Sequence, residues 1–298
     1  MKRFLAAVLF TFLCSLSATA QFQAGCNPLK GQLANPHLAR MGAFTSCPNQ
    51  GDGGAPSQAQ NIAKNNFCAA NSPVEVNISL LRSLEAVTEA RLNQAHIPFG
   101  SPTNIPPDRN RLRQGFNVGN MTFREGMAVL IRAFVLDAHY SNLKKGESVN
   151  CKIGGKKNND IHVALGATPS SDECFGVTAE ISPHFRPETW ADFDDWEFSH
   201  PIMFVGQLFY DASHKPCTQG HPVSPARIAS WEIHPVYSIF VCKNATLQAC
   251  PSNNPNVWWA FHEWVNLPDD EEEGHHVKKK RQSFWALKEL LYGSETRL

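Results

Sequence analysis

Five short β-type runs, separated by too little helical sequence to form βαβ units, limit most strongly what this chain can fold into. Each run is rich in Val, Ile and Phe and is bounded by Gly, Pro, Asn or Ser, which is typical of strands. The long first run and a glycine inside the fourth, Gly206, favour a small closed barrel of the OB-fold type in a mainly β protein. A β-sandwich is the alternative. The runs cover residues 126–140, 160–166, 176–183, 201–214 and 231–242.

The β-type region, residues 123–242, lies between segments of different composition. Residues 21–71 are rich in Asn, Gln, Gly, Ala and Pro, and we predict an irregular arm held by its cysteines. Residues 98–122 form a linker rich in Pro, Asn and Gly, and residues 243–298 form an extension rich in tryptophan and charge.

Residues 72–97 are predicted to form an amphipathic helix. Ser72-Pro73-Val74-Glu75 matches a capping box with proline at the first helical position. Apolar side chains then follow at helical spacing, which predicts a stripe that packs on the main domain. The stripe consists of Leu80, Leu81, Leu84 and Val87.

The C-terminal extension contains an aromatic cluster, opposite charge blocks and a short apolar pattern. We expect the aromatic cluster to pack on the barrel, and a stacking platform for sugars or bases is the alternative. The charge blocks, residues 269–273 and 278–281, indicate a solvated hinge, and residues 284–291 indicate a short amphipathic helix. The aromatic cluster consists of Trp258, Trp259, Phe261 and Trp264.

The first twenty residues are predicted to be a secretory signal peptide. Lys2 and Arg3 precede an apolar run over residues 4–13, and residues 18–20 give the small-residue cleavage pattern. This run is too short to span a bilayer as a helix, and no other stretch is long and apolar enough. We therefore expect an exported protein, periplasmic or extracellular, without a transmembrane segment.

Eight cysteines remain after removal of the signal, and an even number in an exported chain predicts disulfides. None of them forms a C-x-x-C pair, which argues against a zinc ribbon or a thioredoxin-type site. Three precede residue 70 and five follow residue 150, so full pairing requires a bridge from the arm to the later part. The eight are Cys26, Cys47, Cys68, Cys151, Cys174, Cys217, Cys242 and Cys250.

The charge balance disfavours nucleic acid as a partner. The chain has 27 basic and 27 acidic residues, and removal of Lys2 and Arg3 leaves 25 − 27 = −2. A non-specific nucleic-acid binder normally has a basic surplus. Local basic faces stay open as anion contacts, and the candidates are Arg109, Arg111 and Arg113 in the linker and His184 with Arg186 in a proline-bracketed turn.

Three acid–histidine combinations lie in or beside the predicted strands. In two of them the partners are two positions apart and share one face of a strand, and the third closes a strand at a turn. Carboxylate and imidazole groups bind zinc and similar divalent ions, and a carboxylate that orients a histidine is a general-base arrangement. The candidate ligand-binding residues are Asp160, His162, Asp211, His214, Glu232 and His234.

A structural interpretation of these residues competes with the functional one. Asp, Ser and His close turns at strand ends, and His162 can be a core histidine bonded to Asp160 or Glu232. The sequence contains no H-E-x-x-H metal motif and no G-x-S-x-G nucleophile motif. The leading interpretation requires no cofactor. Under the alternative, a divalent metal would be bound by His162, His214, Glu232 and His234.

Four stretches together resemble a group of exported bacterial proteins. In that group N-D-I-H is followed by A-E-I-x-P, then G-x-x-F-x-D-x-x-H, then W-E-[IL]-H-P. The resemblance implies that residues 120–242 form one domain, and it carries no activity with it. The matching stretches here are residues 148–166, 177–190, 206–214 and 230–242.

Three kinds of function are compatible with these features. The leading prediction is an exported, disulfide-stabilised β-barrel that binds a saccharide, a cell-wall fragment or a nucleic acid, the usual partners of OB-type surfaces. The second is a divalent-metal-dependent hydrolase of the nuclease or phosphoesterase type that uses the acid–histidine pairs. The third is a structural envelope protein whose polar pairs stabilise the fold.

Overall fold

The computed structural model describes residues 47–66, 69, 72–184, 186–218, 223–267 and 277–278. The predicted signal peptide, Cys26, Cys68 and the predicted C-terminal amphipathic helix lie outside the described residues, as does most of the two charge blocks.

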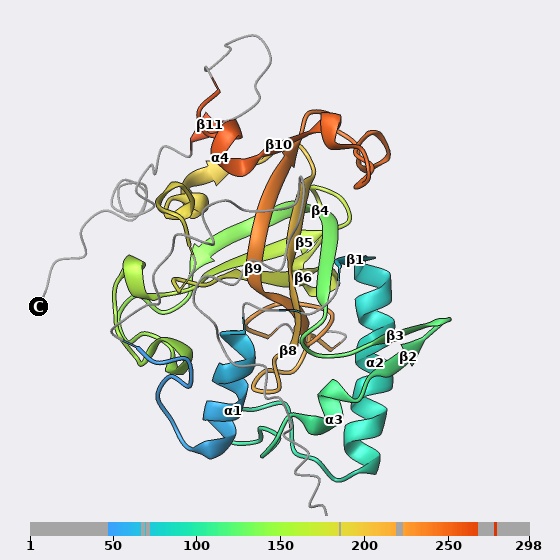
Figure 1. Ribbon diagram of the computed structural model, residues 1–298, viewed down its shortest axis with the longest axis vertical. Helices are drawn as coiled ribbons and strands as arrows, with labels where there is room; N and C mark the ends of the chain where they lie inside the picture. The colour runs from blue at the N-terminus through green and yellow to red at the C-terminus, as the bar shows by residue number, and fades with distance from the viewer. Residues whose placement is uncertain are drawn as a thin grey trace, which may run out of the picture.

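Five strands close into a mixed barrel at the centre of the molecule (Figure 1). Antiparallel pairing joins β4 to β5, β5 to β6, β9 to β8 and β8 back to β4, and a parallel contact joins β6 to β9. The circular order is therefore β4-β5-β6-β9-β8, and the predicted OB-like barrel is confirmed. All five predicted strands form, as β4 (Ala128–Tyr140), β5 (Ile161–Gly166), β6 (Val177–Ile181), β8 (Ile202–Tyr210) and β9 (Trp231–Cys242).

Alternation along β5 and β6 separates the barrel core from an outer polar face. Every second side chain belongs to the hydrophobic core: Ile161, Val163 and Leu165 on β5, and Val177, Ala179 and Ile181 on β6. Because successive side chains of a strand point to opposite faces, the residues between them point outward. These outward residues are His162, Ala164, Thr178 and Glu180.

Gly206 is required because the backbone of β9 leaves no room for a side chain at this position of β8. A Cβ atom at this position would lie 2.4 Å from the carbonyl oxygen of Pro235 and 2.5 Å from Cγ2 of Ile233. The strand register shifts at the same place, which marks a bulge. The glycine within this strand and the proline within β9 therefore have one explanation, since a bulge tolerates both residues.

The helix α2 (Ile78–Gln94) begins later than predicted. Residues 74–76 instead form β1 (Val74–Val76), which pairs in parallel with β4. The capping box predicted at residues 72–75 is wrong, because the sheet takes these residues and Asn77 caps the helix through a hydrogen bond from the Leu80 amide at 2.8 Å. Leu81 and Leu84 of the predicted stripe are buried, whereas Val87 is exposed.

Part of the arm predicted to be irregular is helical. Residues 55–64 form α1 (Ala55–Lys64), with proline in the first turn. Its buried residues are mostly polar, namely Gln60, Asn61, Ala63 and Lys64, so the helix has no apolar stripe that periodicity could detect. The predicted linker also contains α3 (Asn110–Arg113) and a hairpin of β2 (Phe116–Val118) and β3 (Met121–Phe123).

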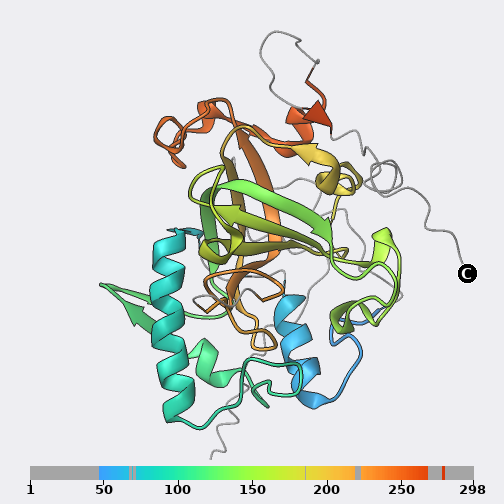
Figure 2. The ribbon, with the colours of Figure 1, turned by 180° about the vertical axis from the view of Figure 1, so that it is seen from behind.

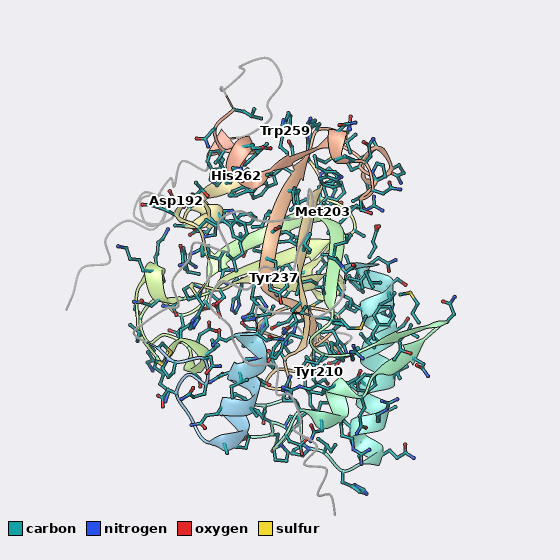
Figure 3. The ribbon with its side chains drawn as sticks, in the orientation of Figure 1. Asp192, Met203, Tyr210, Tyr237, Trp259 and His262 are labelled. Carbon is teal, nitrogen blue, oxygen red and sulfur yellow. A yellow bond between two sulfur atoms is a disulfide. The ribbon has the colours of Figure 1, made fainter. Side chains whose placement is uncertain are left out.

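The Trp-rich segment closes the end of the barrel opposite α1 and α2, as both ribbon views show (Figures 1 and 2). There β10 (Trp258–Ala260) pairs with β9, and α4 (Phe261–Trp264) follows. Trp258, Phe261 and Trp264 are buried, so the aromatic cluster packs on the barrel as predicted. Trp259 and His262 lie at this end, whereas Tyr210 lies near the other (Figure 3). A further short ladder pairs β7 (Trp196–Glu197) with β11 (Val277–Lys278).

Among the described residues, three disulfides join Cys47 to Cys151, Cys174 to Cys217 and Cys242 to Cys250. The first is the predicted bridge between the N-terminal arm and the later part of the chain. Disulfides fit an oxidising compartment outside the cytoplasm. Within the described ranges, none of the helices combines the length and apolar character that crossing a bilayer requires.

We predict that the Cys47–Cys151 bridge stabilises the fold more than the Cys242–Cys250 bridge. The two bridges have sequence separations of 104 and 8 residues. Chain-entropy arguments then give losses of about 4.7 and about 2.5 kcal/mol for double Cys→Ala variants. Urea unfolding of the two variants measures this difference. Equal losses would show that loop entropy does not set the contribution of these bridges.

We also predict that stability falls between pH 5 and 8 because of Glu85 on α2. This buried carboxyl accepts hydrogen bonds from the Ser230 amide at 2.9 Å and the Tyr210 hydroxyl at 3.4 Å. Burial, with a smaller contribution from Glu89, raises its pKa from 4.5 to about 7. The unfolded chain therefore ionises first as pH rises, which removes about 3 kcal/mol of stability by pH 7.

Glu85→Gln should keep an acceptor oxygen and remove this loss. The free energy of unfolding of the variant, measured with urea, should therefore improve relative to that of the unsubstituted protein between pH 5 and pH 8. The exposed Glu188 provides the matched control, Glu188→Gln. A stability difference that is the same at both pH values would contradict the assignment.

Candidate functional site

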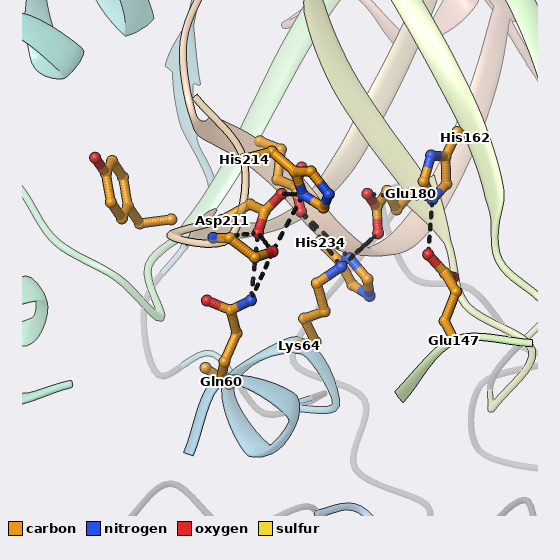
Figure 4. A network of polar contacts seen from close by, with 12 residues as sticks. Gln60, Lys64, Glu147, His162, Glu180, Asp211, His214 and His234 are labelled. Atoms are coloured by element: carbon orange, nitrogen blue, oxygen red, sulfur yellow. Dashed lines mark hydrogen bonds and ion pairs between the residues drawn. The ribbon is translucent and has the colours of Figure 1, made fainter. Parts of the chain in front are cut away.

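A cluster of charged side chains lies between the outer face of β6 and β9 on one side and α1 with two loops on the other (Figure 4). The loops are the β4–β5 loop, residues 141–160, and the β8–β9 loop, residues 211–230. Five carboxylates, three histidines and two permanent cations gather there, and all of them except Asp160 form ion pairs within the cluster. We call these ten residues the charged cluster: Lys64, Glu147, Asp160, His162, Glu180, Asp211, His214, Arg227, Glu232 and His234.

Glu180 of β6 joins three members of the cluster. Its carboxylate lies 3.1 Å from Lys64 Nζ, 2.5 Å from His234 Nδ1 and 3.4 Å from His162 Nε2. Burial alone would raise its pKa, but the charges of His162 and Lys64 hold that pKa well below its usual range. The sequence analysis missed this residue, although a single acid inside the apolar run of residues 176–183 was a usable signal.

His162 of β5 faces two carboxylates rather than Asp160 or Glu232. Its Nε2 atom lies 3.4 Å from Glu180 and 3.6 Å from Glu147 of the β4–β5 loop. Burial would lower the pKa of His162, but these carboxylates raise it to about 10. Burial would raise the pKa of Glu147, but His162 lowers it to about 2. The imidazolium is therefore the stable form at neutral pH.

Asp160, Glu180 and His234 form a group of three potential metal ligands within the cluster. One potential ligand atom of each lies within 4.8 Å of the others, and all three residues are buried. Burial raises the pKa of Asp160 to about 7, and Glu147 adds to this effect. Burial would lower the pKa of His234, but Glu180 raises it to about 9.

Arg227 of the β8–β9 loop neutralises two buried carboxylates at once. Its Nη2 lies 2.7 Å from Asp211 and its Nη1 lies 2.5 Å from Glu232. Burial would raise the pKa of Asp211, but Arg227 holds that pKa well below its usual range. No pattern in the surrounding sequence marked this arginine, because a loop residue acquires its role only from what the loop covers.

Asp211 also orients His214 at the edge of the cluster. The carboxylate lies 2.8 Å from His214 Nδ1 and is fixed by the Ser213 amide at 3.0 Å and by Gln60 at 3.3 Å. The His214 side chain is 43% exposed. A buried carboxylate behind a solvent-accessible imidazole is a general-base arrangement. Of the three predicted acid–histidine pairs, Asp211 with His214 is in contact, as is the buried pair Glu232 with His234 at 3.5 Å.

The structure brings all six predicted residues into one network but not to one point. Arg227 engages Glu232 and Asp211 engages His214, so the metal set predicted under the hydrolase alternative, His162, His214, Glu232 and His234, does not converge. In the described part of the chain, the group close enough to share one ion is instead Asp160, Glu180 and His234. Two of its members were predicted as site residues.

Two adjoining clefts open beside the charged cluster. The strand–loop cleft, about 430 Å³, lies over the outer face of β5 and β6 and is bounded by both loops. The helix–loop cleft, about 360 Å³, lies between α1 and the same loops. Asn142, Glu147 and His214 line both clefts, so the two spaces meet at these residues.

Two of the arginines predicted as anion contacts, Arg109 and Arg186, support the scaffold. Arg109 is buried and binds both carboxylate oxygens of Glu125. Arg186 donates to the carbonyl oxygens of Asn159 at 2.8 Å and Lys156 at 2.7 Å. Their guanidinium groups therefore fix loops of the protein instead of facing an open surface.

We predict that Arg227→Met destabilises the protein strongly. The substitution leaves Asp211 and Glu232 buried without their shared cation, and loss of one partner of a buried ion pair costs about 3–5 kcal/mol. Urea unfolding at neutral pH measures the loss. Addition of Asp211→Asn and Glu232→Gln should recover part of it, because the uncompensated charges are then gone.

Lys152→Met is the matched control for this prediction. Lys152 lies 2.9 Å from Asp52, and both side chains are more than half exposed. Exposed ion pairs contribute little, so this variant should unfold almost as the unsubstituted protein does. An Arg227→Met variant that behaves like Lys152→Met would show that the buried carboxylates do not need the guanidinium.

Comparisons of the chain with protein-family models, with curated proteins and with solved structures found no match. The resemblance to exported bacterial proteins therefore stays a prediction, and the function has to be argued from the site.

Proposed function

We propose that this protein is an exported binding module for an oligosaccharide, which lies in the strand–loop cleft and extends into the helix–loop cleft. The observation that carries the proposal is the junction of the two clefts at Asn142, Glu147 and His214. Two spaces that meet in this way suit an elongated polar ligand better than a compact apolar one.

The lining of the clefts has the chemistry that sugar hydroxyls need. It combines amide and hydroxyl groups with carboxylates, which together donate to and accept from hydroxyl groups. Val223, Pro225 and Ala226 add an apolar edge that a sugar ring can cover. The polar lining residues are Ser141, Asn142, Glu147, Glu173 and Thr178 in the strand–loop cleft, with Ser57, Gln60, Asn61, Ser148 and Ser213 in the helix–loop cleft.

The same lining argues against a nucleic acid. Among the described residues that line the two clefts, Lys64 is the one lysine or arginine, and it is committed to Glu180. A groove that follows a phosphate backbone needs several cationic side chains. The acidic residues Glu147 and Glu173 would instead repel phosphate.

The location agrees with the barrel type. OB-type barrels bind oligosaccharides and oligonucleotides on the outer face of their second and third strands, between the loops that follow the first and fourth strands. In this barrel those elements are β5 and β6, the β4–β5 loop and the β8–β9 loop, which bound the strand–loop cleft.

The Asp211–His214 pair favours a hydrolase as the second candidate. His214 lines both clefts while Asp211 orients its ring, so a general base would stand beside a ligand that crosses the junction. Cleavage of a bound oligosaccharide that is lost in His214→Gln, with binding retained, would favour this candidate over a binding module.

We predict that Ala164→Trp abolishes oligosaccharide binding. Ala164 points outward from β5 into the strand–loop cleft, and an indole there would occupy the space without changing any charge. Binding is measured on a glycan array and then by calorimetry with soluble cell-wall oligosaccharides. Val87→Trp on the exposed surface of α2 is the control and should bind normally.

Two results would contradict the proposal. Binding of single-stranded oligonucleotides with no binding of saccharides would assign the clefts to nucleic acid. Absence of both kinds of binding in the correctly folded protein would favour the structural envelope interpretation.

A further inference from the structure

We propose that Asp160, Glu180 and His234 form a binding site for a divalent transition-metal ion, and that the Lys64 ammonium competes with the ion for this site. This inference is independent of the proposed oligosaccharide function. It rests on the distances, the missing hydrogen bonds and the charge balance of the charged cluster.

The three residues supply a suitable ligand set within a short range. Two carboxylates and one imidazole are typical ligands of Zn²⁺ and of Mn²⁺ or Co²⁺. Their ligand atoms lie within 4.8 Å of one another, and a Zn²⁺ ion binds nitrogen and oxygen at about 2.0–2.2 Å. The separations of the three ligand atoms are therefore close to those that one bound ion imposes on its ligands.

Asp160 is the observation that points to a ligand. Its side chain is completely buried, and neither of its carboxylate oxygens has a hydrogen-bond partner within the described part of the protein. The Nε2 atom of His234 is also buried and also has no hydrogen-bond partner within the described residues. Buried polar groups in folded proteins are almost always satisfied, so these atoms indicate a bound species that holds them together.

The permanent charges show which kind of species is missing. Five carboxylates of the charged cluster face two permanent cations, Lys64 and Arg227, and Arg227 is committed to Asp211 and Glu232. Lys64 and the imidazolium of His162 then face Glu147 and Glu180, so the excess of negative charge remains at Asp160. A divalent cation compensates this excess where Asp160 has no other partner.

Lys64 occupies part of the same position. Its ammonium lies 3.1 Å from Glu180 Oε2 and 4.0 Å from Glu232 Oε1, so it faces the carboxylate that the ion would use (Figure 4). Two cations that share a carboxylate repel each other in a buried site. Removal of the lysine charge should therefore make metal binding tighter, whereas removal of Asp160 should make it weaker.

Zn²⁺ binding to the full-length mature protein, stripped with chelator, tests the proposal by calorimetry and by thermal unfolding. We expect Zn²⁺ to raise the melting temperature of the unsubstituted protein, because an ion that binds only the folded state stabilises it. Asp160→Asn should weaken Zn²⁺ binding by at least about tenfold. Lys64→Met should strengthen it by a comparable factor.

The variants separate metal binding from folding. Asp160→Asn removes a buried charge without a partner, so its metal-free form should be at least as stable as the unsubstituted metal-free protein. Co²⁺ substitution should give visible absorption bands that are lost in Asp160→Asn. His139→Gln is the control for surface histidines, because His139 forms an exposed pair with Asp137 at 2.6 Å.

Three outcomes overturn the proposal. They are no thermal stabilisation by Zn²⁺, equal Zn²⁺ affinity in Asp160→Asn and the unsubstituted protein, or loss of affinity in His139→Gln alone. Weaker Zn²⁺ binding in Lys64→Met than in the unsubstituted protein would contradict the proposal that the Lys64 ammonium competes with the ion.

Discussion

Compensation of buried carboxylates is the constraint on which the rest of this molecule depends. The barrel places Glu180 and Glu232 on neighbouring strands, and both are buried. Neither strand supplies a permanent cation, so the positive charge has to come from elsewhere in the chain. Lys64 is delivered by α1 and Arg227 by the β8–β9 loop. The outer segments therefore do more than cover the barrel, because without them its strands would carry uncompensated charge.

This constraint explains why function and stability overlap in the structure. The side chains that fix the two loops also line the clefts, since Glu147 binds His162 and Asp211 binds His214. Polar groups held by several partners keep one geometry, which is what recognition of a polar ligand requires. The arrangement also means that one substitution in the charged cluster can change loop position, charge balance and ligand contact together.

The barrel could be predicted from the sequence, whereas the site could be predicted only in part. Strand runs such as residues 231–242 carry local signals in composition and in their boundary residues, and these were sufficient. The acid–histidine pairs marked the correct region. Asp160 nevertheless faces Glu180 and His234 and not His162, because side chains on neighbouring strands can lie closer together than side chains two positions apart on one strand. Lys64 and Arg227 had no local signal, since α1 buries polar residues and a loop arginine has no periodicity. Long-range pairing of charges is a property of the fold and not of any window of sequence.

The position of α1 in the chain has a consequence for how the protein acquires its structure. The Lys64–Glu180 and Gln60–Asp211 contacts connect residues 116 and 151 positions apart, so they close only after most of the chain has been synthesised. Contacts of such separation raise the contact order, and loop-closure entropy makes their formation slow. A barrel that forms first would hold Glu180 without its lysine, and protonation of neighbouring histidines would then be its available source of positive charge. The docking of α1 on the barrel therefore has to wait for strand β6 and the β8–β9 loop, which follow it in the chain by more than a hundred residues.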